Sequence, residues 1–88
     1  MTAKQYVSRV HQLHCLICFF MFGQRTPMQE AHHVIPGDDW SVVPLCREHH
    51  QGPLGVHGKH RVGFYRYWKI SGADWLLART AELIAKGT

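Results

Sequence analysis

Two pairs of metal-binding residues, far apart in the sequence, limit most strongly how this chain can fold. Cys15 and Cys18 have the Cys-x2-Cys spacing of a zinc knuckle, and Cys46 and His49 repeat this spacing downstream. Together they supply three thiolates and one imidazole, a complete ligand set for tetrahedral zinc. Taken alone, Cys15 and Cys18 are equally consistent with two buried thiols. The second pair favours a structural Zn²⁺ held by a knuckle that spans residues 15–49.

Two further histidines stand close to the first pair. His11 and His14 precede Cys15 and are alternative ligands, although a surface position is the commoner one for histidine. The apolar residues of positions 1–14 follow helical spacing, so this segment is either a short helix or an extended arm.

Length and composition indicate one small domain over residues 1–88. A chain of 88 residues buries little more than ~60% of its unfolded surface and often needs a staple. Its three cysteines cannot all pair, and no secretory signal or membrane span is present, so we expect reduced thiols in the cytoplasm and no membrane partner. The net charge of +4 suits a polyanionic partner.

The central stretch predicts a ββα unit over about 30–51. Residues 30–35 form a candidate strand, the sequence Pro-Gly-Asp-Asp at 36–39 predicts a turn, and residues 42–45 form a second strand. Pro44 implies that this second strand lies at a sheet edge. A helix follows from Cys46 until Gly52 and Pro53 end it.

The C-terminal part predicts helices over about 62–86. Residues 54–63 contain three glycines and several basic residues, which predict a mobile basic loop. An aromatic helix is predicted at 62–70. The helical spacing of its aromatic residues favours packing into the core over a platform for stacking bases. Ser71 and Asp74 fit a capping box for a last helix that ends near Lys86 and Gly87. The aromatic cluster at 19–22 is expected to pack over the knuckle. The fold class is therefore small α+β.

The adjacent histidines of the ββα unit predict two different environments. His32 and His33 point to opposite sides of their strand, so they cannot easily bind one metal together. His49 and His50 differ by about 100° around the helix. His49 can therefore complete the zinc set while His50 shares a second metal with a strand histidine.

In these motifs the chain resembles the HNH (His-Me finger) nucleases. The resemblance is carried by the sequence Ala-His-His-Val-Ile-Pro at 31–36 and Val-Pro-Leu-Cys-Arg-Glu-His-His at 43–50. Within that group the chain is most similar to small zinc-containing phage HNH endonucleases of the recombination-enhancement type. The similar region runs from Cys15 to about Gly58. The resemblance implies a ββα-metal core with a structural zinc knuckle and C-terminal helices.

The resemblance also implies roles for individual residues. His32 and His50 would bind a catalytic cation, Mg²⁺ or Mn²⁺, and His33 would be the general base. Many family members add a third histidine shortly afterwards, which makes His57 a further candidate ligand and leaves His60 without a family match. Where the family often has asparagine this chain has Ser41, so Asp38 or Asp39 is expected to orient the base instead.

The implied activity is that of a metal-dependent DNA endonuclease or nickase that leaves 5′-phosphate and 3′-hydroxyl ends. Lys59, Arg61 and Arg66 are candidates for contacts to the DNA backbone, with an ordinary solvated face as the alternative. If the protein is phage-encoded, it acts in the cytoplasm of the bacterial host, and a recombination protein is a second candidate partner.

Two other functions fit the same sequence. The chain could be a catalytically weak or silent zinc-stabilised module that binds nucleic acid or assists recombination. Alternatively, the histidines outside the knuckle could be structural and hold a second zinc. Only the nuclease requires His32, His33 and His50 in three defined roles.

Overall fold

A two-stranded antiparallel sheet lies at the centre of the structure, which is a computed structural model describing residues 1–87. Strand β1 (Glu30–His33) pairs with β2 (Val42–Leu45), so that Glu30 faces Leu45 and His33 faces Val42. Both predicted strands are therefore confirmed, with the first ending two residues early. A small α+β fold is confirmed with them.

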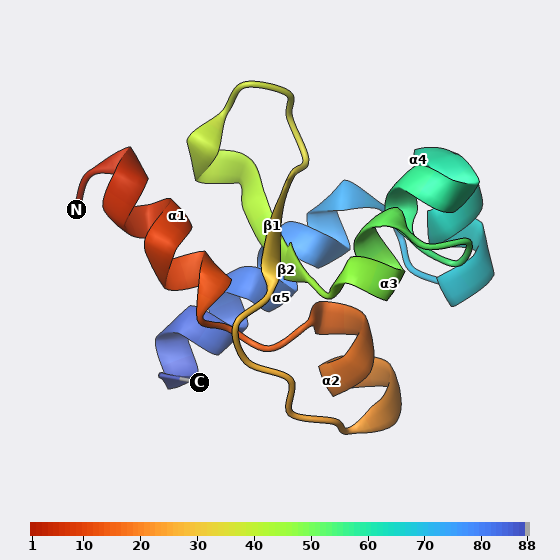
Figure 1. Cartoon of the computed structure of the whole chain (residues 1–88), viewed down its shortest axis with the longest axis horizontal. Coiled ribbons are helices and arrows are strands. Elements are labelled where there is room, and N and C mark those ends of the chain that lie inside the picture. Colours follow the sequence, from red (N-terminus) through yellow and green to blue (C-terminus); the bar gives the residue numbers. More distant parts are fainter. Residues whose placement is uncertain (88) are drawn as a thin grey trace.

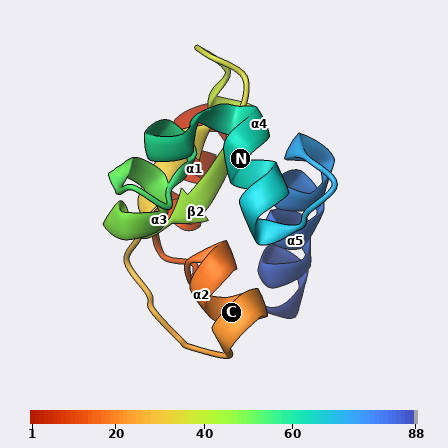
Figure 2. The ribbon, with the colours of Figure 1, turned by 90° about the vertical axis from the view of Figure 1, so that its right-hand side faces the viewer.

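Helices surround this sheet (Figure 1). Four of them, α1, α2, α3 and α5, contact the strands, and α4 packs against α3. Figure 2 shows α2, α3 and α4 from the side on which they lie together. In chain order the helices are α1 (Ala3–His11), α2 (Leu16–Phe22), α3 (Arg47–Gln51), α4 (Val56–Trp68) and α5 (Ala73–Lys86).

The hydrophobic core lies between the sheet and these helices. Every residue of β2 is buried, as expected for the unbroken apolar run that forms it. Strand β1 is more exposed and carries the polar side chains. The large, fully buried apolar side chains come from five elements and one connection: Val10, Leu13, Leu16, Ile17, Val42, Val43, Leu45, Val56, Phe64, Leu76 and Leu83.

The N-terminal segment is a helix rather than an extended arm. Thr2 caps α1 by accepting a hydrogen bond from the Gln5 backbone, and the Gln5 side chain accepts one from the Thr2 backbone. This reciprocal capping box satisfies two of the free N–H groups at the helix start. Helix α1 then packs on both strands and on the connection between them.

The connection between the strands is held by Ser41. Its hydroxyl accepts a hydrogen bond from the Ile35 N–H at 2.9 Å and lies 2.8 Å from the Asp38 carbonyl oxygen. Asp38 in turn caps the short 3₁₀ helix η1 (Asp39–Ser41) through the Trp40 N–H. The buried serine therefore ties the two ends of the loop together.

The prediction of a loop at 54–63 is wrong, because α4 already begins at Val56. The glycines in this segment allow close backbone packing against α3 rather than flexibility. A Cβ at Gly55 would lie 2.7 Å from the Glu48 carbonyl oxygen, and one at Gly58 would overlap the Gly52 carbonyl. The helical course is interrupted only at His60, whose φ of 62° and ψ of 164° bend α4.

The predicted capping box at Ser71 is also wrong. Gly72, with φ of 146°, takes the N-cap position of α5, and no side chain caps the backbone there. The Ser71 hydroxyl instead donates to the Asp74 carboxylate. At the other end, α5 stops as predicted, with Lys86 in the last turn and Gly87 in the left-handed C-cap conformation.

Candidate metal centres

The predicted zinc ligands lie together in the structure. The Nδ1 atom of His49 is 3.7 Å from the Sγ of Cys15, 3.5 Å from that of Cys18 and 3.2 Å from that of Cys46. The sulfurs of Cys18 and Cys46 are 3.9 Å apart. Around a tetrahedral zinc ion, bond lengths of ~2.3 Å to sulfur and ~2.0 Å to nitrogen separate two sulfurs by about 3.8 Å and a sulfur from a nitrogen by about 3.5 Å. The cluster is thus positioned to bind a metal ion, in agreement with a structural zinc.

Two helix starts bring these ligands together. Cys15 is the N-cap residue of α2 and Cys18 lies in its first turn, while Cys46 and His49 occupy the same positions on α3. The spacing of three residues places both members of each pair on one side of a helical turn. The two helices present their N-terminal turns to one point.

Burial affects the protonation of these ligands. It raises the pKa of the Cys15 thiol to about 12 and lowers the pKa of His49. Both shifts favour neutral groups in the absence of a cation, whereas a metal ion binds the thiolate. The ring of Trp68 packs edge-on against His49, and Phe22 packs edge-on against Trp68, so this aromatic pair covers the knuckle.

The two alternative histidines stand outside this cluster. His11 Nδ1 lies 2.7 Å from the Gln29 carbonyl oxygen, and the ring of His14 stacks on Phe19. The structure therefore groups Cys15, Cys18, Cys46 and His49 without either of them.

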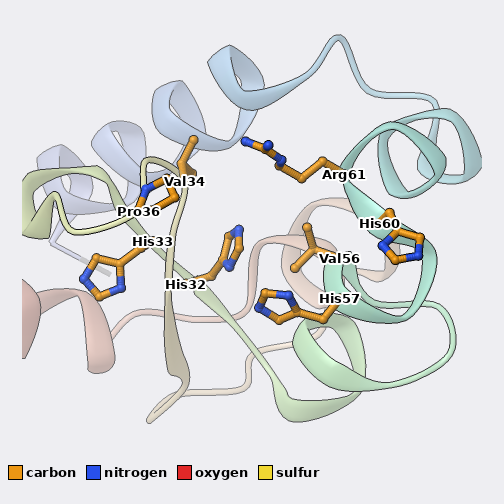
Figure 3. A pocket seen from close by; sticks show the side chains of 8 residues that line it. All are labelled: His32, His33, Val34, Pro36, Val56, His57, His60 and Arg61. Atoms are coloured by element: carbon orange, nitrogen blue, oxygen red, sulfur yellow. The ribbon is translucent and has the colours of Figure 1, made fainter.

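A second cluster combines three histidines from three elements. The ligand atoms of His32 on β1, His50 on α3 and His57 on α4 all lie within 4.8 Å of one another. The Nε2 atoms of His50 and His57 are 3.1 Å apart. Figure 3 shows His32 and His57 facing each other across the gap between the strand and α4. The glycine-mediated approach of α4 to α3 is what places His57 beside His50.

The hydrogen bonds of His32 and His50 leave one ring nitrogen of each able to bind a metal. His32 is buried, and its Nε2 has no hydrogen-bond partner within residues 1–87. Its pKa is lowered to about 4, mainly by burial and to a smaller extent by the neighbouring basic side chains. His50 bonds Glu30 through Nδ1, with 2.8 Å between Nδ1 and Oε1. We assign the Nδ1 proton to this bond, which leaves Nε2 of His50 as an acceptor.

Sequence reasoning missed Glu30, although a signal was present. Glu30 stands two residues before His32, and residues two apart on a strand share a face. The hydrogen bonds that Glu30 accepts from His50 and Gln51 lower the pKa of its carboxyl group. This carboxylate orients the His50 ring, as acidic groups behind metal-binding histidines commonly do.

His33 occupies the opposite side of β1 from His32, as the strand alternation predicts (Figure 3). Its Nε2 lies 2.9 Å from the Oδ1 of Asp39, and both side chains are exposed. Of the two aspartates expected to orient His33, the structure selects Asp39, while Asp38 caps η1. Within residues 1–87, the Ser41 side chain forms no hydrogen bond with His33; it bonds backbone groups of the loop instead.

Two open cavities adjoin the histidine cluster. One has a volume of about 400 Å³ and extends from the strand to α4, where His60 and Arg61 line it. The other, of about 420 Å³, runs past Gly37 and His50. Both are lined by His32, His33 and His57, so these side chains are accessible from two directions.

The three basic residues predicted to contact DNA are distributed along α4. Arg61 extends over the first cavity toward Val34 (Figure 3). Lys59 places its ammonium 4.6 Å from the centre of the Tyr67 ring, and Arg66 is exposed. Only Arg61 among them adjoins the histidine cluster.

Comparisons with known proteins give no match for this chain, whether with protein-family models, curated proteins or solved structures. Within residues 1–87, none of the helices has both the length and the apolar character needed to cross a membrane.

Proposed function

We propose that the protein is a metal-dependent DNA endonuclease or nickase with a ββα-metal core of the HNH (His-Me finger) type. The observation that carries the proposal is the juxtaposition of two different histidine environments on one strand. His32 joins His50 and His57 in a cluster with metal-binding spacing, and His33, on the other side of the strand, is oriented by a carboxylate.

The three-histidine cluster has the properties of a catalytic cation site. The buried, unpartnered Nε2 of His32 suits a ligand atom better than an orphaned polar group, which would otherwise cost about 1–3 kcal/mol. Mg²⁺ is a hard cation that takes oxygen ligands, so of the two expected cations the three imidazoles fit the transition ion Mn²⁺ better. When bound, such a cation neutralises the scissile phosphate and stabilises the leaving oxygen.

His33 is suited to accept the proton of an attacking water. Its Nε2–H donates to Asp39, which leaves the Nδ1 lone pair as the proton acceptor. The carboxylate also stabilises the imidazolium formed by that transfer. Both neighbouring cavities reach His33, so water and a phosphate group have access to it.

The basic residues complete the site in this proposal. Arg61 extends over the cavity next to the cluster and is placed to contact a phosphate oxygen of the cleaved strand. Lys59 and Arg66 lie farther along α4 and would contact the backbone without reading sequence. The products would carry 5′-phosphate and 3′-hydroxyl ends.

A second structural zinc explains the cluster less well. Structural zinc sites are closed and four-coordinate. Here His57 is exposed, the described residues supply three grouped imidazoles, and two cavities open onto them. An open coordination position is what hydrolytic chemistry requires.

A plasmid-nicking assay tests this function directly. The zinc-loaded protein is incubated with supercoiled plasmid and Mn²⁺, Mg²⁺ or EDTA, and the nicked product is then treated with DNA ligase. We expect nicks with Mn²⁺, fewer with Mg²⁺ and none with EDTA, and we expect ligase to seal them because the ends are 5′-phosphate and 3′-hydroxyl. Intact plasmid under all three conditions would refute the proposal.

A further inference from the structure

Three aromatic side chains form a surface patch that the proposed site does not use. Phe22 ends α2, while Tyr67 and Trp68 end α4. Trp68 contacts both of the others edge-on, with ring centres 5.8 Å from Phe22 and 5.0 Å from Tyr67. We call these three residues the aromatic platform. Figure 2 shows the two helices on one side of the molecule.

The platform is exposed to an extent that core packing does not explain. Phe22 is 57% exposed and Tyr67 49%, whereas Phe64 on the same α4 is fully buried. The expectation that the aromatic stripe packs into the core is thus wrong for Tyr67, whereas Tyr65, Trp68 and Ile70 do pack against the core. Trp68 anchors the platform, because its indole N–H donates to the Leu54 carbonyl and its ring covers the zinc ligand His49.

The two segments that carry the platform contain basic residues and no acidic ones. All six acidic residues of the chain lie outside residues 1–29 and 49–73, which contain α2 and α4. The Lys59 ammonium lies over the Tyr67 ring, and Arg66 and Lys69 flank the platform residues on α4. Exposed rings beside cations are complementary to a polyanion that carries aromatic groups.

The platform is connected to the histidine cluster through α4 and α3. Lys59 follows the cluster residue His57 by two positions, and its contact with Tyr67 joins the two ends of the bent helix. On α3, Trp68 covers His49 while the neighbouring His50 belongs to the cluster. The cluster and the platform are thus carried by the same pair of helices, α3 and α4, with Phe22 added from α2.

We propose that the aromatic platform stacks the unpaired bases of single-stranded DNA, with Lys59 contacting the adjoining phosphate. Exposed rings can stack on bases only where these are not already stacked in a duplex. This inference deepens the proposed function, on which it rests for its choice of DNA. It names the substrate class as DNA with an unpaired segment next to the cleaved bond.

Equilibrium binding without added Mn²⁺ tests the platform separately from cleavage. Fluorescence anisotropy is measured with the zinc-loaded protein on a labelled 12-residue oligothymidylate and on a 12-base-pair duplex. We expect tighter binding to the single strand. Phe22→Ala and Tyr67→Ala should each weaken it roughly 5- to 150-fold, the usual effect of losing one stacking ring. Because neither change removes a charge, the salt dependence should stay the same, whereas Lys59→Ala should reduce its slope.

Two exposed apolar residues outside the platform provide controls. Val62→Ala removes a 68%-exposed side chain from α4, and Trp40→Ala removes a 52%-exposed ring from η1. Both should bind the oligothymidylate like the parent protein. Unchanged binding by Phe22→Ala and Tyr67→Ala would overturn the inference, as would equal affinity of the parent for single strand and duplex. So would a dimer, seen by sedimentation, that either platform change dissociates. If the binding results hold but the plasmid assay shows no nicks, the nuclease proposal fails while the platform remains.

Discussion

Asp39 holds His33 through a 2.9 Å contact between Oδ1 and Nε2, across the loop that joins β1 to β2. The contact determines which ring nitrogen is left to accept a proton. Asp39 is one of the two aspartates expected to contact His33, because Ser41 stands where the HNH nucleases often have asparagine.

Asp39→Ala should therefore reduce plasmid nicking while leaving zinc content and fold unchanged. The loss of the carboxylate frees the ring to rotate and to change tautomer, so we expect a decrease of about 10-fold or more. Asp38→Asn is the matched control, because it removes a charge from the same loop and retains a good N-cap side chain for η1. Equal rates for Asp39→Ala and the parent protein would exclude Asp39 from positioning the base.

Ser41 is expected to stabilise the loop rather than to take part in chemistry. Ser41→Ala leaves the Ile35 N–H without its 2.9 Å partner, which should lower the free energy of unfolding by about 1–3 kcal/mol. Urea denaturation measures this change. Ser71→Ala is the control, since within residues 1–87 the exposed Ser71 hydroxyl donates to the Asp74 carboxylate alone and its loss should cost less than about 0.5 kcal/mol. Equal costs for the two changes would contradict this role.

The zinc cluster should determine whether the chain folds. In small zinc domains the metal-binding free energy, on the order of 10 kcal/mol or more, is folding free energy. We expect the purified protein to contain tightly bound zinc, and Cys18→Ser to lose it together with the helical circular dichroism signal. Removal of zinc by a chelator should unfold the parent protein, and re-added zinc should restore it. A folded protein that contains no metal would contradict this prediction.

His57 and His60 are separated by one helical turn and should behave differently. His57 belongs to the histidine cluster, whereas His60 lines the adjoining cavity at the bend of α4. His57→Ala should raise the Mn²⁺ concentration needed for half-maximal nicking by at least ~10-fold. His60→Ala should leave this concentration unchanged and alter mainly DNA affinity and its salt dependence. The same Mn²⁺ requirement in both variants would restrict the ligand set to His32 and His50.

The sequence was sufficient for the parts of the fold that follow from local patterns. Strand β2 has the predicted bounds, because an apolar β-branched run between a turn and a zinc ligand has few alternatives. The Cys3His cluster could be predicted because the same spacing of three residues occurs twice, at Cys15 and Cys18 and at Cys46 and His49. The opposite orientations of His32 and His33 followed from strand alternation alone.

Other features depend on tertiary contacts that no local pattern specifies. Gly55 and Gly58 read as loop residues, yet their lack of a Cβ is what lets α4 approach α3 and deliver His57 to the cluster. Glu30 could not be paired with His50 before the packing of α3 on β1 was known. The exposure of Phe22 and Tyr67 likewise depends on how α2 and α4 meet, which periodicity does not report.

The central claim is that His33 is the general base of a cation-dependent nuclease, and one measurement tests it most directly. Supercoiled plasmid is nicked with Mn²⁺ by the parent protein and by His33→Ala, each checked for equal zinc content and circular dichroism. Loss of a general base typically costs ~100- to ~10,000-fold in rate. We expect a decrease of this size, with unchanged affinity for DNA. Equal nicking rates for the two proteins would contradict it.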